Sequence, residues 1–235
     1  MFFRSISPHQ INKKSNYYCE ILHFSKINDI IDLISLINEE NGMSSKNINT
    51  KGINFPKTRL GMAKMNKLAE AAEELFSEVG FYSTSIVDIC KRADTAVGTF
   101  YIYFETKADV YRYLLTKYKD DIGASMSEAI SSHTDKAKRN RESIRSFIKY
   151  VREHPNAYTV ILGSLSVDRS MFFGCISAFA EALEGELGGE GGDSSALAYS
   201  LIGISGMLGL KAISEEMTDE DIDKMIDGFS LASLI

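Results

Sequence analysis

Apolar residues recur every three or four positions along most of this chain, which is the spacing of an amphipathic α-helix. Over residues 63–79 they define one buried face: Leu68, Ala72, Leu75 and Val79. From Asp109 onward they recur at intervals of four and predict a long helix: Val110, Leu114, Tyr118, Ile122, Met126 and Ile130. No segment shows a convincing two-residue alternation, so the pattern predicts an all-α fold of about nine helices.

The periodic segments become short between these two helices. Ser85, with Asp88 three residues later, forms a capping box that begins a second helix. This helix carries one apolar stripe: Ile86, Ile89, Cys90 and Ala93. Thr106 and Asp109 repeat the capping pattern at the start of the long fourth helix, which could act as a lever between the segments on either side of it.

A third short helix follows a tight turn. Asp94 stands where the turn needs a positive φ, which Asp tolerates better than most side chains, and Thr95 can cap the helix. Phe100 and Phe104 lie four residues apart and should anchor this helix to the other two. Four side chains should be free to meet a partner: Val97, Thr99, Ile102 and Tyr103. The layout predicts a helix-turn-helix that reads nucleic acid.

Residues 64–115 resemble the TetR family of bacterial and archaeal repressors. The resemblance rests on Ala71-Ala72-x-x-Leu75-Phe76-x-x-x-Gly80-Phe81, Thr84-Ser85-Ile86-x-Asp88-Ile89 and Gly98-Thr99-Phe100-Tyr101-x-Tyr103-Phe104, with Lys107 and Val110 after them. Many matched positions at fixed spacing make this pattern specific. The chain departs from the family's common residues on or beside the reading helix, at Asp94, Thr95, Ala96 and Val97, and these departures concern which DNA sequence is read.

The resemblance implies an N-terminal three-helix DNA-binding domain whose third helix enters the major groove of double-stranded operator DNA. The residues that it brings to DNA are Thr84, Ser85, Thr95, Ala96, Val97, Gly98, Thr99, Tyr101, Tyr103 and Lys107. Residues 95–99 would approach base edges, and the others would hold phosphates. Three alternatives stay open: Tyr101 as a core residue, Ser85 as a helix cap only and Lys107 as a solvated residue.

The net charge of −6 is unevenly distributed along the chain. Residues 43–119 carry +4, whereas residues 120–235 carry −9 and residues 1–42 carry −1. The positive part coincides with the helix-turn-helix, which fits attraction to phosphates. The acidic part should repel DNA and so favour one docking orientation.

Five further helices are expected after a polar break at residues 131–138. His154-Pro155 ends the first of them, and Thr218 with Asp221 caps the last, which should reach nearly to Ile235. The resemblance implies that this C-terminal helical domain binds a small-molecule inducer. An apolar cavity lining would select a hydrophobic one, and its candidate residues are Phe147, Tyr150, Tyr158, Ile161, Leu162, Leu165, Phe172, Phe173 and Met207. For each side chain, plain core packing is the alternative.

Glycines recur every three residues in the helix expected over residues 195–214, at Gly203, Gly206 and Gly209. With Ser200 and Ala212 they form a strip of small residues that permits close helix approach. This helix and the last helix, which Thr218 begins, could therefore pair with their copies in a homodimer. The candidate interface residues are Ser200, Gly203, Gly206, Met207 and Leu210. Close packing within one monomer is the alternative.

Residues 1–61 are expected to form an N-terminal extension and a flexible arm. The DNA-binding domain would then cover residues 62–121, and the ligand-binding and dimerisation domain residues 122–235. A helix is predicted over residues 26–41, and Met43 as the true start of translation is an equally open interpretation. The basic residues of the arm could reach DNA phosphates or only be solvated: Lys46, Lys51, Lys57 and Arg59.

The remaining chemistry argues against other classes of protein. Three dispersed cysteines suggest a reducing compartment, with neither a disulfide framework nor a metal cage. The four histidines lack metal-ligand spacing, and the uncharged run at residues 194–210 is too short for a confident membrane span. We therefore expect a cytoplasmic repressor, with no enzymatic activity, cofactor or metal, that a small hydrophobic ligand releases from DNA. A ligand-responsive activator, a DNA binder without inducer and an adaptor that has lost DNA binding are the alternatives.

Overall fold

The computed structural model describes residues 51–187, 193–215 and 217–228 of the chain. Within these ranges the chain forms nine α-helices and one isolated β-bridge, which confirms the predicted all-α fold. None of the described helices combines the length and the apolar character that crossing a bilayer requires. The helix predicted over residues 26–41, Met43 and the last residues of the C-terminal helix lie outside the described residues.

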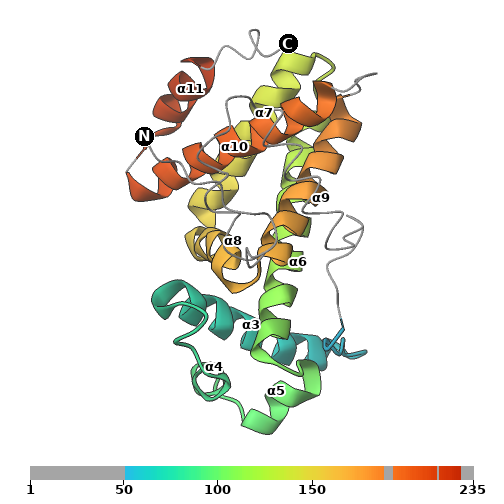
Figure 1. The fold of residues 1–235 in the computed structure, drawn as a ribbon, viewed down its shortest axis with the longest axis vertical. Coiled ribbons are helices and arrows are strands. Elements are labelled where there is room, and N and C mark those ends of the chain that lie inside the picture. The colour runs from blue at the N-terminus through green and yellow to red at the C-terminus, as the bar shows by residue number, and fades with distance from the viewer. Residues whose placement is uncertain (1–50, 188–192, 216, 229–235) are drawn as a thin grey trace, which may run out of the picture.

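Three helices form the head of the molecule, at the lower end of Figure 1: α3 (Arg59–Val79), α4 (Ile86–Arg92) and α5 (Val97–Tyr103). The next helix, α6 (Lys107–Ser131), rises from the head into the upper part of the molecule (Figure 1). The head is therefore joined to the rest of the chain by one long continuous helix.

Five helices surround the upper part of α6 and form the body (Figure 1): α7 (Lys136–Glu153), α8 (Pro155–Val167), α9 (Arg169–Leu187), α10 (Asp193–Ser214) and α11 (Asp219–Gly228). α7 packs along α6, and α10 packs against both α7 and α9. α8 packs on α9 and also on α3 of the head. Of the body helices, α8 thus makes the main contact with the head.

Capping residues explain where several helices begin. Thr58 begins α3 by accepting a hydrogen bond from the amide of Gly61 (3.1 Å), so this helix starts four residues earlier than its apolar pattern predicts. The capping boxes predicted for α4 and α6 both form, and Asp168 accepts from the amide of Ser170 (2.8 Å) at the start of α9. The predicted buried face of α3 is wrong at its last residue, because Val79 lies on the exposed end of the helix.

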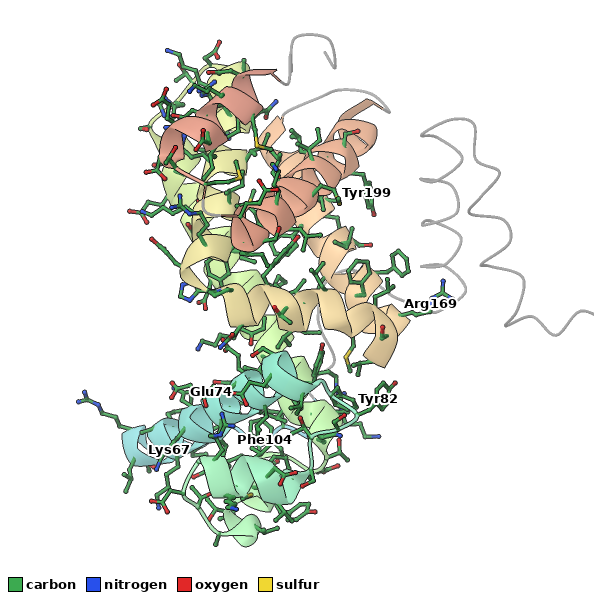
Figure 2. The ribbon with its side chains drawn as sticks, turned by 90° about the vertical axis from the view of Figure 1, so that its left-hand side faces the viewer. Lys67, Glu74, Tyr82, Phe104, Arg169 and Tyr199 are labelled. Carbon is green, nitrogen blue, oxygen red and sulfur yellow. The ribbon has the colours of Figure 1, made fainter. Side chains whose placement is uncertain are left out.

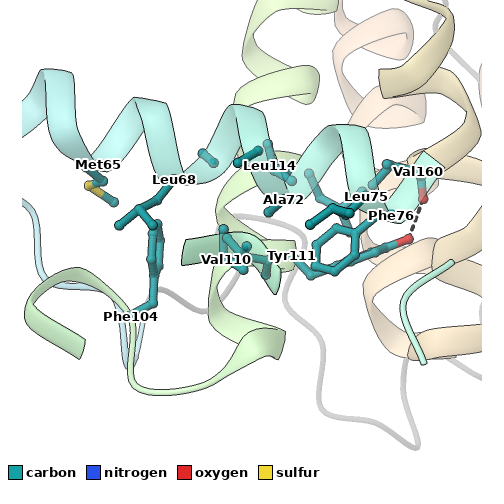
Figure 3. Close-up of a cluster of buried hydrophobic side chains, with 14 of the residues drawn as sticks. Met65, Leu68, Ala72, Leu75, Phe76, Phe104, Val110, Tyr111, Leu114 and Val160 are labelled. Atoms are coloured by element: carbon teal, nitrogen blue, oxygen red, sulfur yellow. Dashed lines mark hydrogen bonds between the residues drawn. The ribbon is translucent and has the colours of Figure 1, made fainter. Parts of the chain in front are cut away.

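One hydrophobic core runs from the head into the body (Figure 3). At one end, Leu68 of α3 lies against Phe104, which directly follows α5. At the other end, Phe76 of α3 packs on Tyr111 of α6, whose hydroxyl donates to the carbonyl of Val160 in α8. The expected domain boundary after residue 121 falls inside α6, so the division into a DNA-binding and a ligand-binding domain remains a proposal.

Residues 52–58 are part of the head. Ile53 forms the isolated antiparallel bridge with Phe104, and its side chain is buried in the core of the head. Backbone hydrogen bonds of 2.8 and 3.0 Å extend this pairing on either side, and the ring of Phe55 packs 6.1 Å from that of Tyr113. These residues differ from the expected flexible arm, because their backbone pairs with the chain that leaves α5.

Candidate nucleic-acid interface and apolar cavity

The turn between α4 and α5 has the geometry that the sequence predicts. Asp94 adopts a φ of 49°, and among the described residues it is the single non-glycine residue with a positive φ. The amide of Thr95 donates to the carbonyl of Cys90 (2.9 Å) and closes the turn. The prediction that Thr95 caps α5 is wrong, because the cap position falls one residue later, at Ala96, and no side chain caps this helix.

The exposed side of α5 and its cap carries no charge. We call it the reading surface, and it consists of Ala96, Val97, Gly98, Tyr101 and Ile102. Thr99 is half-buried beside it. Tyr101 is 53% exposed, which excludes the alternative of a core residue, whereas Tyr103 is only 6% exposed. The prediction that Tyr103 is free to meet a partner is wrong, because its ring belongs to the core of the head.

Thr84 and Ser85 both serve the fold at the start of α4. Thr84 is buried, and its hydroxyl donates to the carbonyl of Gly80 (2.8 Å), so it offers little surface to a phosphate. The hydroxyl of Ser85 accepts from the amide of Asp88 (3.1 Å), whose carboxylate accepts from the amide of Ser85 (3.0 Å). The hydrogen bonds from Ser85 hold the pKa of the Asp88 carboxyl below its ordinary value. Ser85 remains exposed, so its phosphate contact stays a prediction.

The charged side chain of Lys107 contacts other groups of the protein. Its ammonium donates to the carbonyls of Phe81 and Thr84, both at 2.5 Å, and lies 4.3 Å from the centroid of the Phe81 ring. Burial lowers the pKa of Lys107 from its ordinary value. The ammonium therefore fastens the start of α6 to the loop between α3 and α4. The alternative of a merely solvated Lys107 does not hold, and a phosphate would have to compete with two carbonyls for it.

Two arginines of the head are also paired with carboxylates. Arg92 of α4 contacts Glu74 (2.8 Å) and Glu78 (2.9 Å) of α3, and its hydrogen bond holds the pKa of Glu78 below the ordinary value. Arg112 of α6 pairs with the buried carboxylate of Asp109. The sequence reasoning missed the pairs of Arg92, since Glu74 and Glu78 lie on the preceding helix, 18 and 14 residues earlier in the chain.

The body contains an apolar cavity of about 240 Å³ between α6, α7, α8, α9 and α10. Six of the predicted lining residues contribute to its wall: Phe147, Tyr158, Ile161, Leu162, Phe172 and Met207. The sequence reasoning missed the other wall residues: Ile122, Met126, Ser143, Ile144, Ile176, Phe179, Leu201, Ile202, Gly203, Ser205, Gly206 and Leu210. None of the described side chains that line the cavity is charged. The hydroxyl of Tyr158 donates to the carbonyl of Gly206, and burial raises the pKa of Tyr158 to about 12.

The other three predicted lining residues do not contribute to the cavity wall. Tyr150 is buried and packs its ring 4.5 Å from that of His154. Leu165 is exposed on α8, and Phe173 packs on Phe172 without lining the cavity. Helical spacing alone could not separate these residues from the six that do contribute.

A second hollow, of about 390 Å³, lies between α7 and α11 and has a charged wall. Its cations and carboxylates largely satisfy one another, as in the pairs Arg152–Asp219 (2.6 Å) and Arg145–Asp223. In the described part of the chain, no three His, Cys, Asp or Glu side chains come together as a metal site would require. The apolar cavity is therefore the better candidate for holding a small molecule.

The small residues on α10 have two different environments: some pack against neighbouring helices, and others are open to solvent. A Cβ at Gly209 would lie 3.2 Å from Phe147, and one at Gly206 would lie 3.6 Å from the hydroxyl of Tyr158. Gly209 therefore permits close packing within the monomer, which was the open alternative, whereas the space at Gly206 would accept a Cβ. Gly203 faces open space, and Met207, one turn later, is 67% exposed, so this part of the α10 face both borders the apolar cavity and remains open in the described chain.

Comparison with known proteins identifies a family match in the head and relatives over part of the chain. Residues 68–114 match the family model described as bacterial regulatory proteins, tetR family. The transcriptional activator FasR of Mycolicibacterium smegmatis is 23% identical over 113 residues, which cover 48% of this chain and 50% of the relative. The fatty acid metabolism regulator protein of Bacillus subtilis is 33% identical over 60 residues, which cover 26% of this chain and 29% of that protein. The chain thus spans half or less of the length of these curated relatives.

Solved structures share the fold over most of the chain. The regulator FadR of Bacillus subtilis, in complex with stearoyl-CoA, has a TM-score of 0.58 at 18% identity and covers 69% of this chain and 95% of that one. A TetR-family regulator from Syntrophomonas wolfei has a TM-score of 0.60 at 23% identity and covers 74% of this chain and 95% of that one. At these identities the likeness is one of fold.

Proposed function

We propose that this chain, which belongs to the TetR family of regulatory proteins, is a sequence-specific transcriptional regulator. The observation that carries this proposal is the reading surface: exposed, uncharged side chains on a short helix that Phe100 and Phe104 anchor in the core. A helix presented in this way suits the major groove of operator DNA.

Base reading by this head would depend on hydroxyl and methyl groups. Val97 and the methyl of Thr99 could contact thymine methyl groups, and the hydroxyl of Thr99 could exchange hydrogen bonds with base edges. Tyr101 and Ser85 are exposed enough to reach phosphates. Thr84, Tyr103 and Lys107 would act instead by holding the reading helix in position.

We also propose that the apolar cavity takes a slender hydrophobic ligand, such as a fatty acyl chain. Its uncharged wall supports this class of ligand, and its volume lies just below the roughly 300–1,000 Å³ of ordinary ligand pockets. Two proteins of similar sequence or fold point the same way, since one is named a fatty acid metabolism regulator and another was solved with stearoyl-CoA.

The regulator would work as a homodimer in the cytoplasm, where its DNA lies, and without enzymatic activity. The exposed part of α10 around Gly203 and Met207 supports the dimer, since an uncharged apolar face suits a self-complementary contact. Release of a repressor by ligand is the main form of this proposal. Activation is the second form, and the name of the activator FasR favours it.

Binding to the DNA upstream of the chain's own coding sequence tests the proposal. A fluorescent duplex of that DNA should bind the full chain more tightly than a scrambled duplex, because base contacts add to phosphate contacts. Stearoyl-CoA should then weaken binding if the chain is a ligand-released repressor, or strengthen it if the chain is an activator. Equal affinity for the two duplexes and no response to stearoyl-CoA would contradict the proposal.

A further inference from the structure

The reading surface carries no charge, so the attraction to phosphates must come from elsewhere on the head. Three cations close in sequence to α4 and α5 are already engaged: Arg92 with two glutamates, Arg112 with Asp109 and Lys107 with two carbonyls. Lys91 of α4 is exposed, but it supplies a single charge. Affinity for duplex DNA depends largely on the number of phosphates that a protein neutralises.

Unpaired positive charge gathers just before and within the first half of α3. No acidic residue occurs between Glu40 and Glu70, whereas this stretch holds six basic residues. Four of them are exposed and form no ion pair with any carboxylate in the described ranges: Lys57, Arg59, Lys64 and Lys67. We call these four the basic surface. The second half of α3 is acidic, and two of its glutamates bind Arg92.

The fold brings the basic surface to the end of the reading helix. The bridge between Ile53 and Phe104 holds the chain that leads into α3 beside the end of α5. In Figure 3, Met65 and Leu68 of the basic half of α3 lie on the side of Phe104. Figure 2 places Lys67 on the opposite side of the head from Tyr82, which contacts the body. The basic surface therefore begins beside the end of the reading helix, and its Lys67 lies on the side of the head opposite the Tyr82 contact with the body.

We propose that the basic surface binds the phosphate backbone of duplex DNA next to the groove that α5 enters. This inference rests on the proposed function and narrows it, because it moves the phosphate contacts from Lys107 to the segment before and within α3. Phosphate contacts of this kind set the position of a protein on DNA, while base contacts select the sequence. The basic surface would thus supply affinity, and the reading surface would supply specificity.

The salt dependence of binding to a short duplex of random sequence tests this inference. The double variant Lys64→Gln/Lys67→Gln should reduce the slope of log affinity against log salt by about 1.8, since each lost phosphate contact removes about 0.9. A second pair, Lys57→Gln/Arg59→Gln, should reduce it by a similar amount. Because all four side chains are exposed, thermal melting should confirm that the variants fold.

The control is Lys149→Gln/Lys224→Gln, which removes two exposed positive charges from the body and should leave the slope unchanged. Unchanged slopes in both head variants, or an equal loss of slope in the control, would overturn the inference while leaving DNA binding intact. If the wild-type chain binds no duplex at any salt concentration, the proposed function itself fails.

Discussion

Gly52 shows how one residue allows the chain before α3 to dock on the head. It adopts a φ of +85°, and a Cβ there would lie 2.7 Å from a carboxylate oxygen of Asp109. That carboxylate is buried and accepts hydrogen bonds from the amide (2.7 Å) and hydroxyl (2.8 Å) of Thr106, so it has little freedom to move. Both the backbone conformation and the close approach therefore require glycine.

Replacing this glycine should destabilise the head. We expect Gly52→Ala to lower the free energy of unfolding by about 1–3 kcal/mol, because a side chain must then adopt a left-handed conformation and displace Asp109. Urea unfolding followed by circular dichroism measures the change. The matched control is Gly123→Ala in α6, where a Cβ meets no atom within 4 Å. That variant should gain about 0.5–1 kcal/mol from helix propensity, and an equal gain at Gly52 would show that the docked conformation is not maintained.

At the scale of single elements, α8 lines the cavity and also packs against the head. Ile161 and Leu162 of this helix line the cavity. The carbonyl of Val160 accepts from Tyr111 of α6, and the carbonyl of Ser166 accepts from the hydroxyl of Tyr82 (3.0 Å) in the loop between α3 and α4. A ligand that shifts α8 would therefore act at two points, on α6 through Tyr111 and on the head through Tyr82, close to the start of α4.

The bond from Tyr82 allows this coupling to be measured. Tyr82→Phe removes one hydroxyl from a ring that is 73% exposed, so its effect on stability should stay within about 0.5 kcal/mol. The effect of stearoyl-CoA on DNA affinity should shrink by about 0.5–2 kcal/mol, because one of the two contacts from α8 is lost. Fluorescence anisotropy of operator DNA, with and without stearoyl-CoA, measures this difference.

A hydroxyl removed from elsewhere in the body provides the control for this experiment. Tyr199→Phe in α10 removes a hydroxyl near Ser177 that makes no contact with the head (Figure 2). This variant should respond to stearoyl-CoA as the wild type does. If Tyr82→Phe also responds as the wild type does, the contact between Tyr82 and Ser166 carries no signal.

At the scale of the whole molecule, the continuous core joins the head to the body, whereas the uneven charge distinguishes the two parts electrostatically. The core joins head and body through α3, α6 and α8, so the two parts are packed together rather than tethered. The charge separates them electrostatically, since residues 43–119 carry +4 and residues 120–235 carry −9. A dimer with both heads at one end would present its positive side to DNA and hold its acidic body away from it.

The dimer can be tested at Met207. Met207→Glu should convert the dimer to a monomer, because it places a charge in the centre of an apolar contact that the two-fold axis repeats. Multi-angle light scattering at micromolar concentration measures the mass. Leu60→Glu is the matched control, since Leu60 is 68% exposed, against 67% for Met207, but lies in the head. A wild-type monomer, or equal dissociation in both variants, would contradict an interface on α10.

The sequence predicts this fold best where the physical cause is local. Capping by Ser85 with Asp88, the positive φ of Asp94 and the apolar spacing of α6 each depend on residues within a few positions of one another. The order of the helices and the presence of a helix-turn-helix could therefore be derived without coordinates. The same reasoning failed for Thr95, where a shift of one residue in the helix start changed the residue that occupies the cap.

Packing between distant segments decided the remaining features. Tyr101 and Tyr103 have the same chemistry and lie two residues apart in α5, yet Tyr103 is buried and Tyr101 is exposed, because only Tyr103 faces the core formed with other helices. Lys107 finds its carbonyl partners more than twenty residues earlier in the chain. The cavity wall combines five helices, so spacing within one helix could name candidates but could not choose among them. Local spacing therefore determined the helices and their reading motif, whereas long-range contacts decided which side chains remain available to DNA and to a ligand.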